Sequence, residues 1–173
     1  MRTPRLFANA FVACLVLLGT GSAIAADEPG NFNAQLKGTY RWFSNASTEG
    51  NSVHLYFIGV VTYDGKGHAT MADRGTGIDP FNQAPPFSFE ETATLTYAVK
   101  RDRSFTQEGT FTSNPVGDYV ITGAKWVGQI GAGGSILVIS GAIPPQPQIF
   151  TSGGVSTVRF GVNSMTAVRI PQQ

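Results

Sequence analysis

The chain has 173 residues, a formal net charge of +1 and one cysteine. Its length suits a single domain with a sizeable core, and one cysteine cannot form a disulfide within the chain. No basic run stands out, which argues against nucleic acid as a partner, because neutralising phosphates requires a concentrated cationic surface.

The first 25 residues have the three-part layout of a secretory signal peptide. Arg2 and Arg5 give a short positive start, and residues 6–18 are almost entirely apolar. Residues 23–25, Ala-Ile-Ala, then form an A-x-A cleavage pattern. The apolar run is shorter than the roughly 20 residues that a helix needs to span a bilayer. We therefore expect a cleaved signal rather than a membrane anchor, and no stable membrane span afterwards.

Removal of this signal would leave residues 26–173 as a single mature domain. The only cysteine, Cys14, would leave with the signal, which excludes a thiol nucleophile and a cysteine-based metal site from the mature protein. Loss of Arg2 and Arg5 would reduce the 12 Lys and Arg to 10, against 11 Asp and Glu, for a charge of −1. An exported protein without disulfides is typical of a bacterial periplasm, so we predict a periplasmic or secreted protein.

From residue 36 onward the sequence is typical of β-strands. Short runs of β-branched and aromatic residues alternate with polar ones and end at Gly, Pro, Asn or Asp. The predicted strands are 38–43, 53–63, 68–73, 87–100, 104–112, 119–129, 135–141 and 157–170. Short turns connect most of them. Two longer connections, 74–86 and 142–154, contain several Pro and Gly and are predicted to be loops of the kind that form lids or mouths.

The strand predicted over residues 87–100 shows the clearest alternation. Its odd positions, from Phe87 to Val99, are mostly apolar, and its even positions are mostly Ser, Thr and Glu. Since successive side chains of a strand leave on opposite faces, one face is buried and the other wet, as in antiparallel sheets. We therefore predict an all-β fold, a single antiparallel up-and-down β-barrel of about eight strands. A β-sandwich is the alternative, but only a closed barrel leaves no exposed edge.

Glu91 is the first candidate catalytic residue, because it falls on the apolar face of its strand between Phe89 and Ala93. Burial there would raise its pKa, which is how a general acid is made at neutral pH. Asp73 is the second candidate, because it ends a predicted strand beside the loop that precedes Glu91. Both acids are therefore expected at one mouth. The alternatives are a strand that begins after Glu91, which would put this residue at the wet rim, and an Asp73 that belongs to a turn.

A ligand in the lumen would meet the inward side chains of several strands. The candidates for binding it are aromatic residues and one neutral amide: Tyr40, Trp42, Phe89, Tyr97, Phe105 and Gln107. Both faces of residues 119–129 are mixed, so their inward side stays open, although Lys125 is expected to point outward. The two histidines, His54 and His68, are expected far apart on one hairpin, and we predict neither a metal nor a cofactor.

Two segments resemble a family of secreted bacterial barrels. Residues 38–42 have the pattern G-T-Y-x-W, and residues 57–67, FIGVVTYDGKG, stand where that family has a V-G-x-x-x-x-D-G-x-G hairpin. Over residues 37–112 the chain thus resembles calycin-like or allene-oxide-cyclase-like barrels. It departs from lipocalins proper, since Tyr40 stands in place of the G-x-W tryptophan and the T-D-Y motif is absent. The resemblance implies a calycin-like barrel that holds small apolar molecules or catalyses a cofactor-free cyclisation in its lumen.

Three functions stay open at this point. The preferred one is an exported barrel that binds a small apolar or amphipathic ligand in its lumen or mouth, because no motif demands chemistry. The alternative is a cofactor-free lyase or isomerase of the cyclase type, in which Glu91 with Asp73 moves a proton while aromatic walls fold the substrate. The third is a structural or assembly protein with a packed barrel. An open lumen with a buried Glu91 near Asp73 or a tyrosine would favour the enzyme.

Overall fold

The computed structural model describes residues 31–48, 53–79, 85–114 and 118–171, and the predicted signal peptide lies outside this part. The described chain forms nine strands and two short 3-10 helices, η1 (Phe32–Gln35) and η3 (Ala132–Gly134). The strands are β1 (Lys37–Thr48), β2 (His54–Asp64), β3 (His68–Ile78), β4 (Phe87–Val99), β5 (Ser104–Ser113), β6 (Tyr119–Ile130), β7 (Ile136–Gly141), β8 (Pro147–Ser152) and β9 (Val155–Arg169).

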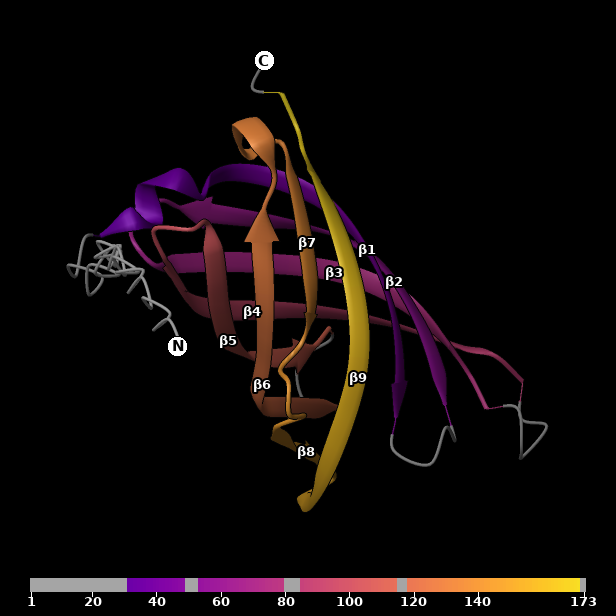
Figure 1. The fold of residues 1–173 in the computed structure, drawn as a ribbon. Coiled ribbons are helices and arrows are strands. Elements are labelled where there is room, and N and C mark those ends of the chain that lie inside the picture. The colour runs from indigo at the N-terminus through magenta and orange to yellow at the C-terminus, as the bar shows by residue number, and fades with distance from the viewer. Residues whose placement is uncertain (1–30, 49–52, 80–84, 115–117, 172–173) are drawn as a thin grey trace, which may run out of the picture.

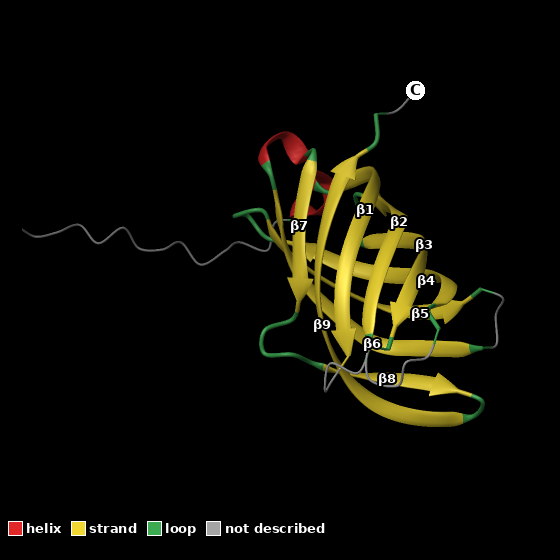
Figure 2. Ribbon diagram, turned by 90° about the vertical axis from the view of Figure 1, so that its right-hand side faces the viewer, coloured by secondary structure: helices red, strands yellow, loops and turns green. Residues whose placement is uncertain are grey.

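The strands form one antiparallel sheet that closes on itself (Figure 1, Figure 2). Consecutive strands from β1 to β7 pair side by side, β9 follows β7, and β9 pairs again with β1. Eight strands therefore make a closed ring, and β8 is an additional strand between β6 and β9. This architecture confirms the predicted antiparallel barrel of about eight strands and excludes the sandwich.

β7 and β8 are two parts of one position in the barrel. β6 pairs with β7 through its C-terminal half and with β8 through its N-terminal half, and β9 is shared between them in the same way. Residues 142–146 form the break between the two strands. The predicted loop over 142–154 was therefore wrong for β8. The prolines that suggested a loop lie in the break or at the first residue of β8, where a sheet tolerates proline.

β3 continues to Ile78, beyond the predicted end at Asp73, so the predicted loop over 74–86 was wrong for its first residues. Gly75 and Gly77 suggested a break in the strand. The structure shows another reason for them, because a Cβ at either position would overlap the ring of Phe89 or of Phe87 on β4. A glycine in a strand that lets a large side chain approach the backbone keeps the ladder intact.

A bulge in β6 explains why its two faces look mixed in the sequence. The register between β5 and β6 shifts between Gly109 and Phe111, and Gly123 has a φ of +75°, a conformation that favours glycine. A bulge inserts one residue and so reverses which positions point inward. Ile121 before the bulge and Trp126 after it therefore face the same interior, although their positions differ by an odd number.

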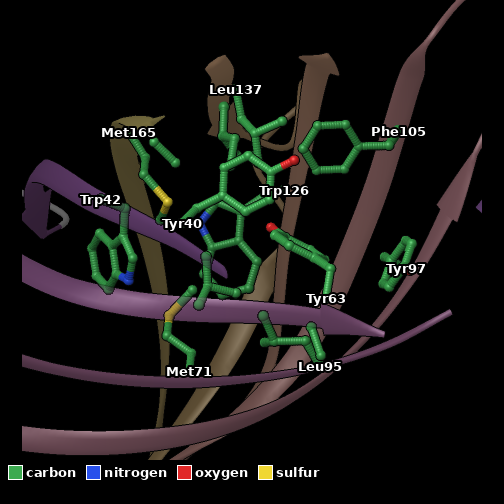
Figure 3. Packing of buried hydrophobic residues seen from close by; sticks show 14 of the residues in the cluster. Tyr40, Trp42, Tyr63, Met71, Leu95, Tyr97, Phe105, Trp126, Leu137 and Met165 are labelled. Atoms are coloured by element: carbon green, nitrogen blue, oxygen red, sulfur yellow. The ribbon is translucent and has the colours of Figure 1, made fainter. Parts of the chain in front are cut away.

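One half of the interior is packed with aromatic side chains (Figure 3). The Tyr63 ring lies edge-on to the rings of Tyr40 and Tyr97, at centroid distances of 5.7 and 5.1 Å. Phe105 adds a further edge contact with Tyr63. The Tyr97 hydroxyl donates to the carbonyl oxygen of Leu36 at 2.8 Å, which ties η1 over this end of the barrel. We call the region around Tyr40, Tyr63, Tyr97 and Phe105, at the η1 end of the barrel, the packed half. The candidate site lies toward the other end.

Candidate ligand-binding site

Five neighbouring strands place one residue each in a row across the interior. The register pairs Trp42 with Gly59, Gly59 with Asp73, Asp73 with Glu91, and Glu91 with Ser113. Side chains that are direct partners across strands lie on the same face of a sheet. Gly59 has no side chain, and the side chains of the other four residues are buried. We call these five residues the polar row.

Gly59 makes room for its two neighbours in the row. A Cβ at this position would lie 2.5 Å from the Cβ of Asp73 and 2.8 Å from the indole nitrogen of Trp42. Both distances are too short for a real side chain. The missing side chain therefore lets the Trp42 indole and the Asp73 carboxyl group approach each other over the backbone of β2.

Asp73 is a buried acid without a hydrogen bond. Its side chain is 8% exposed, and neither carboxyl oxygen has a hydrogen-bond partner in the described part of the chain. Burial raises its pKa to about 8, with a further upward contribution from Glu91. At neutral pH Asp73 therefore keeps its proton and can act as a donor.

Glu91 is a buried acid with a hydrogen bond. It is 5% exposed, and the Tyr119 hydroxyl donates to its Oε2 at 2.8 Å. Burial raises the pKa of Glu91 to about 6, and the hydrogen bond from Tyr119 acts in the opposite direction. Burial and the nearby Glu91 charge raise the pKa of Tyr119, so this hydroxyl stays protonated. At neutral pH Glu91 is mainly ionised, in contrast to Asp73.

Ser113, the last member of the row, positions Tyr119. Its Oγ accepts hydrogen bonds from the backbone N–H groups of Asp118 at 3.0 Å and Tyr119 at 3.1 Å. These bonds fix the start of β6 beside the end of β5. The Tyr119 side chain is thereby held over Glu91, and its ring stacks on Phe150 of β8 at 5.3 Å.

A cavity of about 540 Å³, the mouth cavity, lies at the end of the barrel opposite η1. Its walls are mainly apolar, and their larger members are Leu55, Phe57, Phe87, Phe89, Ile121 and Phe150. On one side the rings of Phe57 and Phe89 meet edge to face at 5.1 Å. On the other side the Arg159 guanidinium lies 4.0 Å from the centre of the Phe150 ring. Glu91 and Tyr119 also line this cavity.

A second space of about 120 Å³, the inner cavity, lies deeper in the lumen, behind the break between β7 and β8. Its lining includes Trp42, Ser44 and Asn163, together with apolar residues of the core. Five residues line both cavities: Leu55, Phe57, Glu91, Ile121 and Gln148. The two spaces therefore adjoin, and Glu91 stands at the junction.

The structure separates the residues predicted to bind a ligand into two groups. Trp42 lines the inner cavity and Phe89 the mouth cavity. The other four line neither cavity: Tyr40, Tyr97, Phe105 and Gln107. They belong to the packed half, where Tyr63 donates to the Oε1 of Gln107 at 2.7 Å.

The two candidate acids come together as one pair in the polar row, and Glu91 is buried rather than at the wet rim. Lys125 points outward, as predicted: it is 49% exposed and lies 3.3 Å from Glu108.

Ser44, Asn163 and the β8 side of the site were not identified from the sequence. A signal for Ser44 existed, since it shares the alternation of Tyr40 and Trp42, but a lone serine carries little information.

Neither a metal site nor a comparison with known proteins assigns a function to the described residues. No group of three or more His, Cys, Asp or Glu in the described residues could hold a metal ion, and His54 and His68 lie at opposite ends of the β2–β3 hairpin. None of the helices in that part of the chain has the length and apolar character needed to cross a membrane. No family model, no curated protein and no solved structure matches the chain. The site is therefore interpreted from its own geometry.

Proposed function

We propose that this protein is an exported β-barrel that binds a small apolar or amphipathic molecule in the open half of its lumen. The mouth cavity carries this proposal. Ligand sites typically have 300–1,000 Å³, mainly apolar walls and a few convergent polar groups. The mouth cavity, with about 540 Å³, aromatic walls and Glu91 and Tyr119 at its inner side, has these properties.

The contrast between the two halves of the barrel supports the same proposal. Aromatic rings and η1 fill the packed half, as expected for a protein interior. In the other half two adjoining spaces stay open. A barrel with only a structural role has no need for one half of its interior to stay open while the other half is packed.

A neutral apolar dye tests the proposal. N-phenyl-1-naphthylamine, whose fluorescence rises in apolar surroundings, should bind the purified protein saturably. Phe89→Ser, in the mouth wall, should weaken this binding about tenfold, because a buried aromatic contact is lost. If Phe89→Ser fails to fold, Ile121→Ser serves the same purpose.

Phe43→Ser is the matched control, because Phe43 is 52% exposed on the outside of the barrel. It should leave the affinity for the dye unchanged. Absence of saturable binding, or an equal loss in both variants, would refute binding in the mouth cavity. Native mass spectrometry of protein from its own host should in addition show a small molecule that copurifies.

The acid pair favours a second candidate function, a cofactor-free isomerase or lyase of the cyclase type. At neutral pH Asp73 carries a proton and Glu91 mainly does not, so the pair offers a donor and an acceptor side by side. General acid–base catalysis needs groups whose pKa values lie near the working pH. In this function Glu91 would take a proton from the substrate at the junction of the cavities, and Asp73, which lines neither cavity, would act only through Glu91.

Hydrogen exchange tests this second candidate. A molecule that copurifies with the protein is returned to the protein in D₂O and its mass is followed. Proton abstraction from carbon would introduce deuterium at a rate that falls at least about a hundredfold in Glu91→Gln. Binding without exchange would leave the mouth cavity as a binding site and exclude this chemistry for that molecule.

A further inference from the structure

The inner cavity gathers polar atoms that have no partner. Trp42 Nε1, Ser44 Oγ and Asn163 Oδ1 are buried without a hydrogen bond in the described part of the chain, and all three residues line this cavity. Trp42 and Ser44 are only 2% and 5% exposed. A buried polar atom without a partner destabilises the folded state, and proteins pair nearly all such atoms. Their convergence on one cavity points to a polar group that binds there.

The chemistry of the three atoms defines that group. The Trp42 indole can only donate, the Ser44 hydroxyl can donate and accept, and the carbonyl oxygen of Asn163 can only accept. A hydroxyl or carbonyl oxygen would satisfy the two donors. The proton of a hydroxyl would in addition satisfy Asn163. The cavity, at about 120 Å³, has room for several waters or for a head group of a few heavy atoms.

The charges around the inner cavity favour a head group without charge. Among the described residues that line it, Lys125 is the only cationic one, and its charge lies outside the barrel beside Glu108. An anion would therefore meet no cation, while Glu91 at the junction would repel it. An ammonium group in the inner cavity would lose its hydration beside the three neutral polar atoms, and Glu91, the one carboxylate in the described lining, lies at the junction with its Oε2 already accepting from Tyr119.

We propose that the inner cavity binds the uncharged hydroxyl or carbonyl end of a mainly apolar molecule whose body occupies the mouth cavity. The inference rests on the proposed binding function and narrows the class of ligand. The five residues shared by both cavities place the polar end and the apolar body in continuous space. Such a molecule enters with its polar end first.

Competition against N-phenyl-1-naphthylamine tests the class of ligand. The probes are 1-decanol, decanoate and decylamine, which share an apolar chain and differ in the head group. Decanol should displace the dye at concentrations about tenfold or more below those of the two charged probes. Equal or stronger displacement by decanoate or decylamine would overturn the proposal. Absence of dye binding would instead refute the proposed function itself.

Decanol also transfers from water to an apolar site more readily than the charged probes, so its stronger displacement alone does not show where its head group binds. Two variants provide the decisive comparison. Ser44→Ala removes one donor and keeps most of the shape, and Trp42→Phe removes the other donor together with one ring of the indole. Each should weaken decanol binding about three- to tenfold, the effect of one hydrogen bond, and Ser44→Ala should leave the affinity for the dye unchanged. Ser164→Ala, on the exposed face of β9, should change neither. Unchanged decanol binding, or an equal loss for decanol and the dye, would overturn the proposal.

The indole N–H of Trp42 gives a direct spectroscopic readout. The chain has two tryptophans, so its proton–nitrogen spectrum has two indole signals, and Trp42→Phe identifies the one that belongs to Trp42. A hydrogen bond from this N–H to decanol should shift that signal downfield during the titration, while the Trp126 signal moves less. A Trp42 signal that stays in place at saturating decanol would overturn the proposal.

Discussion

Asp73 and Glu91 are direct partners in the register of β3 and β4, and both carboxyl groups are buried inside the barrel. Burial raises the pKa of Asp73 to about 8 and that of Glu91 to about 6. Two acids so close in a site of low polarity resist ionising together. Between pH 6 and pH 8 the pair therefore carries about one proton, which resides mainly on Asp73.

The first prediction concerns stability as a function of pH. In the folded protein Asp73 has a pKa of about 8 against an ordinary value of 3.8, so between these values the folded state holds a proton that the unfolded chain has lost. Its contribution to stability is complete below pH 4 and falls as the pH rises to 8. Urea unfolding between pH 6.5 and pH 8 should show a loss of up to about 1.4 kcal/mol per pH unit.

Asp73→Asn should abolish most of this pH dependence, because the amide does not titrate. Glu108→Gln removes a carboxylate that is 57% exposed. In this control the slope of the unfolding free energy against pH should equal that of the unaltered protein. A slope that is the same in Asp73→Asn as in the unaltered protein would contradict the assignment of the proton to Asp73.

The second prediction concerns Tyr119. Its hydroxyl donates to Glu91 at 2.8 Å, and this hydrogen bond lowers the pKa of Glu91 against the effect of burial. Tyr119→Phe should therefore raise the pKa of Glu91 above its value of about 6, as measured by carbon NMR of the labelled carboxyl group. Tyr56→Phe, at a tyrosine that is 52% exposed, is the control and should leave this pKa unchanged. A lower pKa in Tyr119→Phe would show that the bond stabilises the neutral acid.

The polar row could be predicted only in part from the sequence. Glu91 was found because its neighbours at alternate positions are apolar, and Asp73 because it ends a predicted strand beside the loop that precedes Glu91. The pairing of the two acids depends on the register between β3 and β4, which is set by the packing of both strands and not by either strand alone. Gly59 lies between Asp73 and Trp42 in the row and makes room for both side chains. In the sequence it resembles any other glycine in a strand, because its neighbours across the sheet are not known.

The barrel was predictable where one face of a strand is polar. The outward positions of β4 and β5 are almost all Ser, Thr and Glu, so their alternation is plain. β9 is harder to interpret, because its exposed side also carries apolar residues such as Val158, Phe160 and Val162. β8 was missed because six residues after several prolines have the composition of a loop. Its pairing with β6 and β9 outweighs that local preference.

The third prediction concerns Gly59. Gly59→Ala would bring a Cβ within 2.5 Å of the carbonyl oxygen of Ala72, a backbone atom that cannot move aside cheaply. We expect a loss of about 1–3 kcal/mol in the free energy of unfolding. Gly141→Ala is the matched control in another strand, since its nearest neighbour, Asn163 Oδ1, would lie 3.4 Å away. An equal loss in both variants would mean that the cost arises from strand glycines in general and not from the crowding at the polar row.

The fourth prediction separates the packed half from the binding site. The Tyr63 hydroxyl donates to Gln107 Oε1 at 2.7 Å, and both residues are almost fully buried. Tyr63→Phe would leave that oxygen without a partner and should cost about 1–3 kcal/mol of stability. Adding Gln107→Leu should recover part of this loss, because replacing both partners by apolar groups removes the unpaired polar atoms.

Both variants of this fourth prediction should bind N-phenyl-1-naphthylamine as the unaltered protein does, because neither Tyr63 nor Gln107 lines the mouth cavity. Urea unfolding measures the stability, and a titration with the dye measures the affinity. A double variant less stable than Tyr63→Phe would show that Gln107 contributes more than this one hydrogen bond. A change in dye affinity would show that the two halves of the barrel are coupled, since the altered groups and the mouth cavity share no residue.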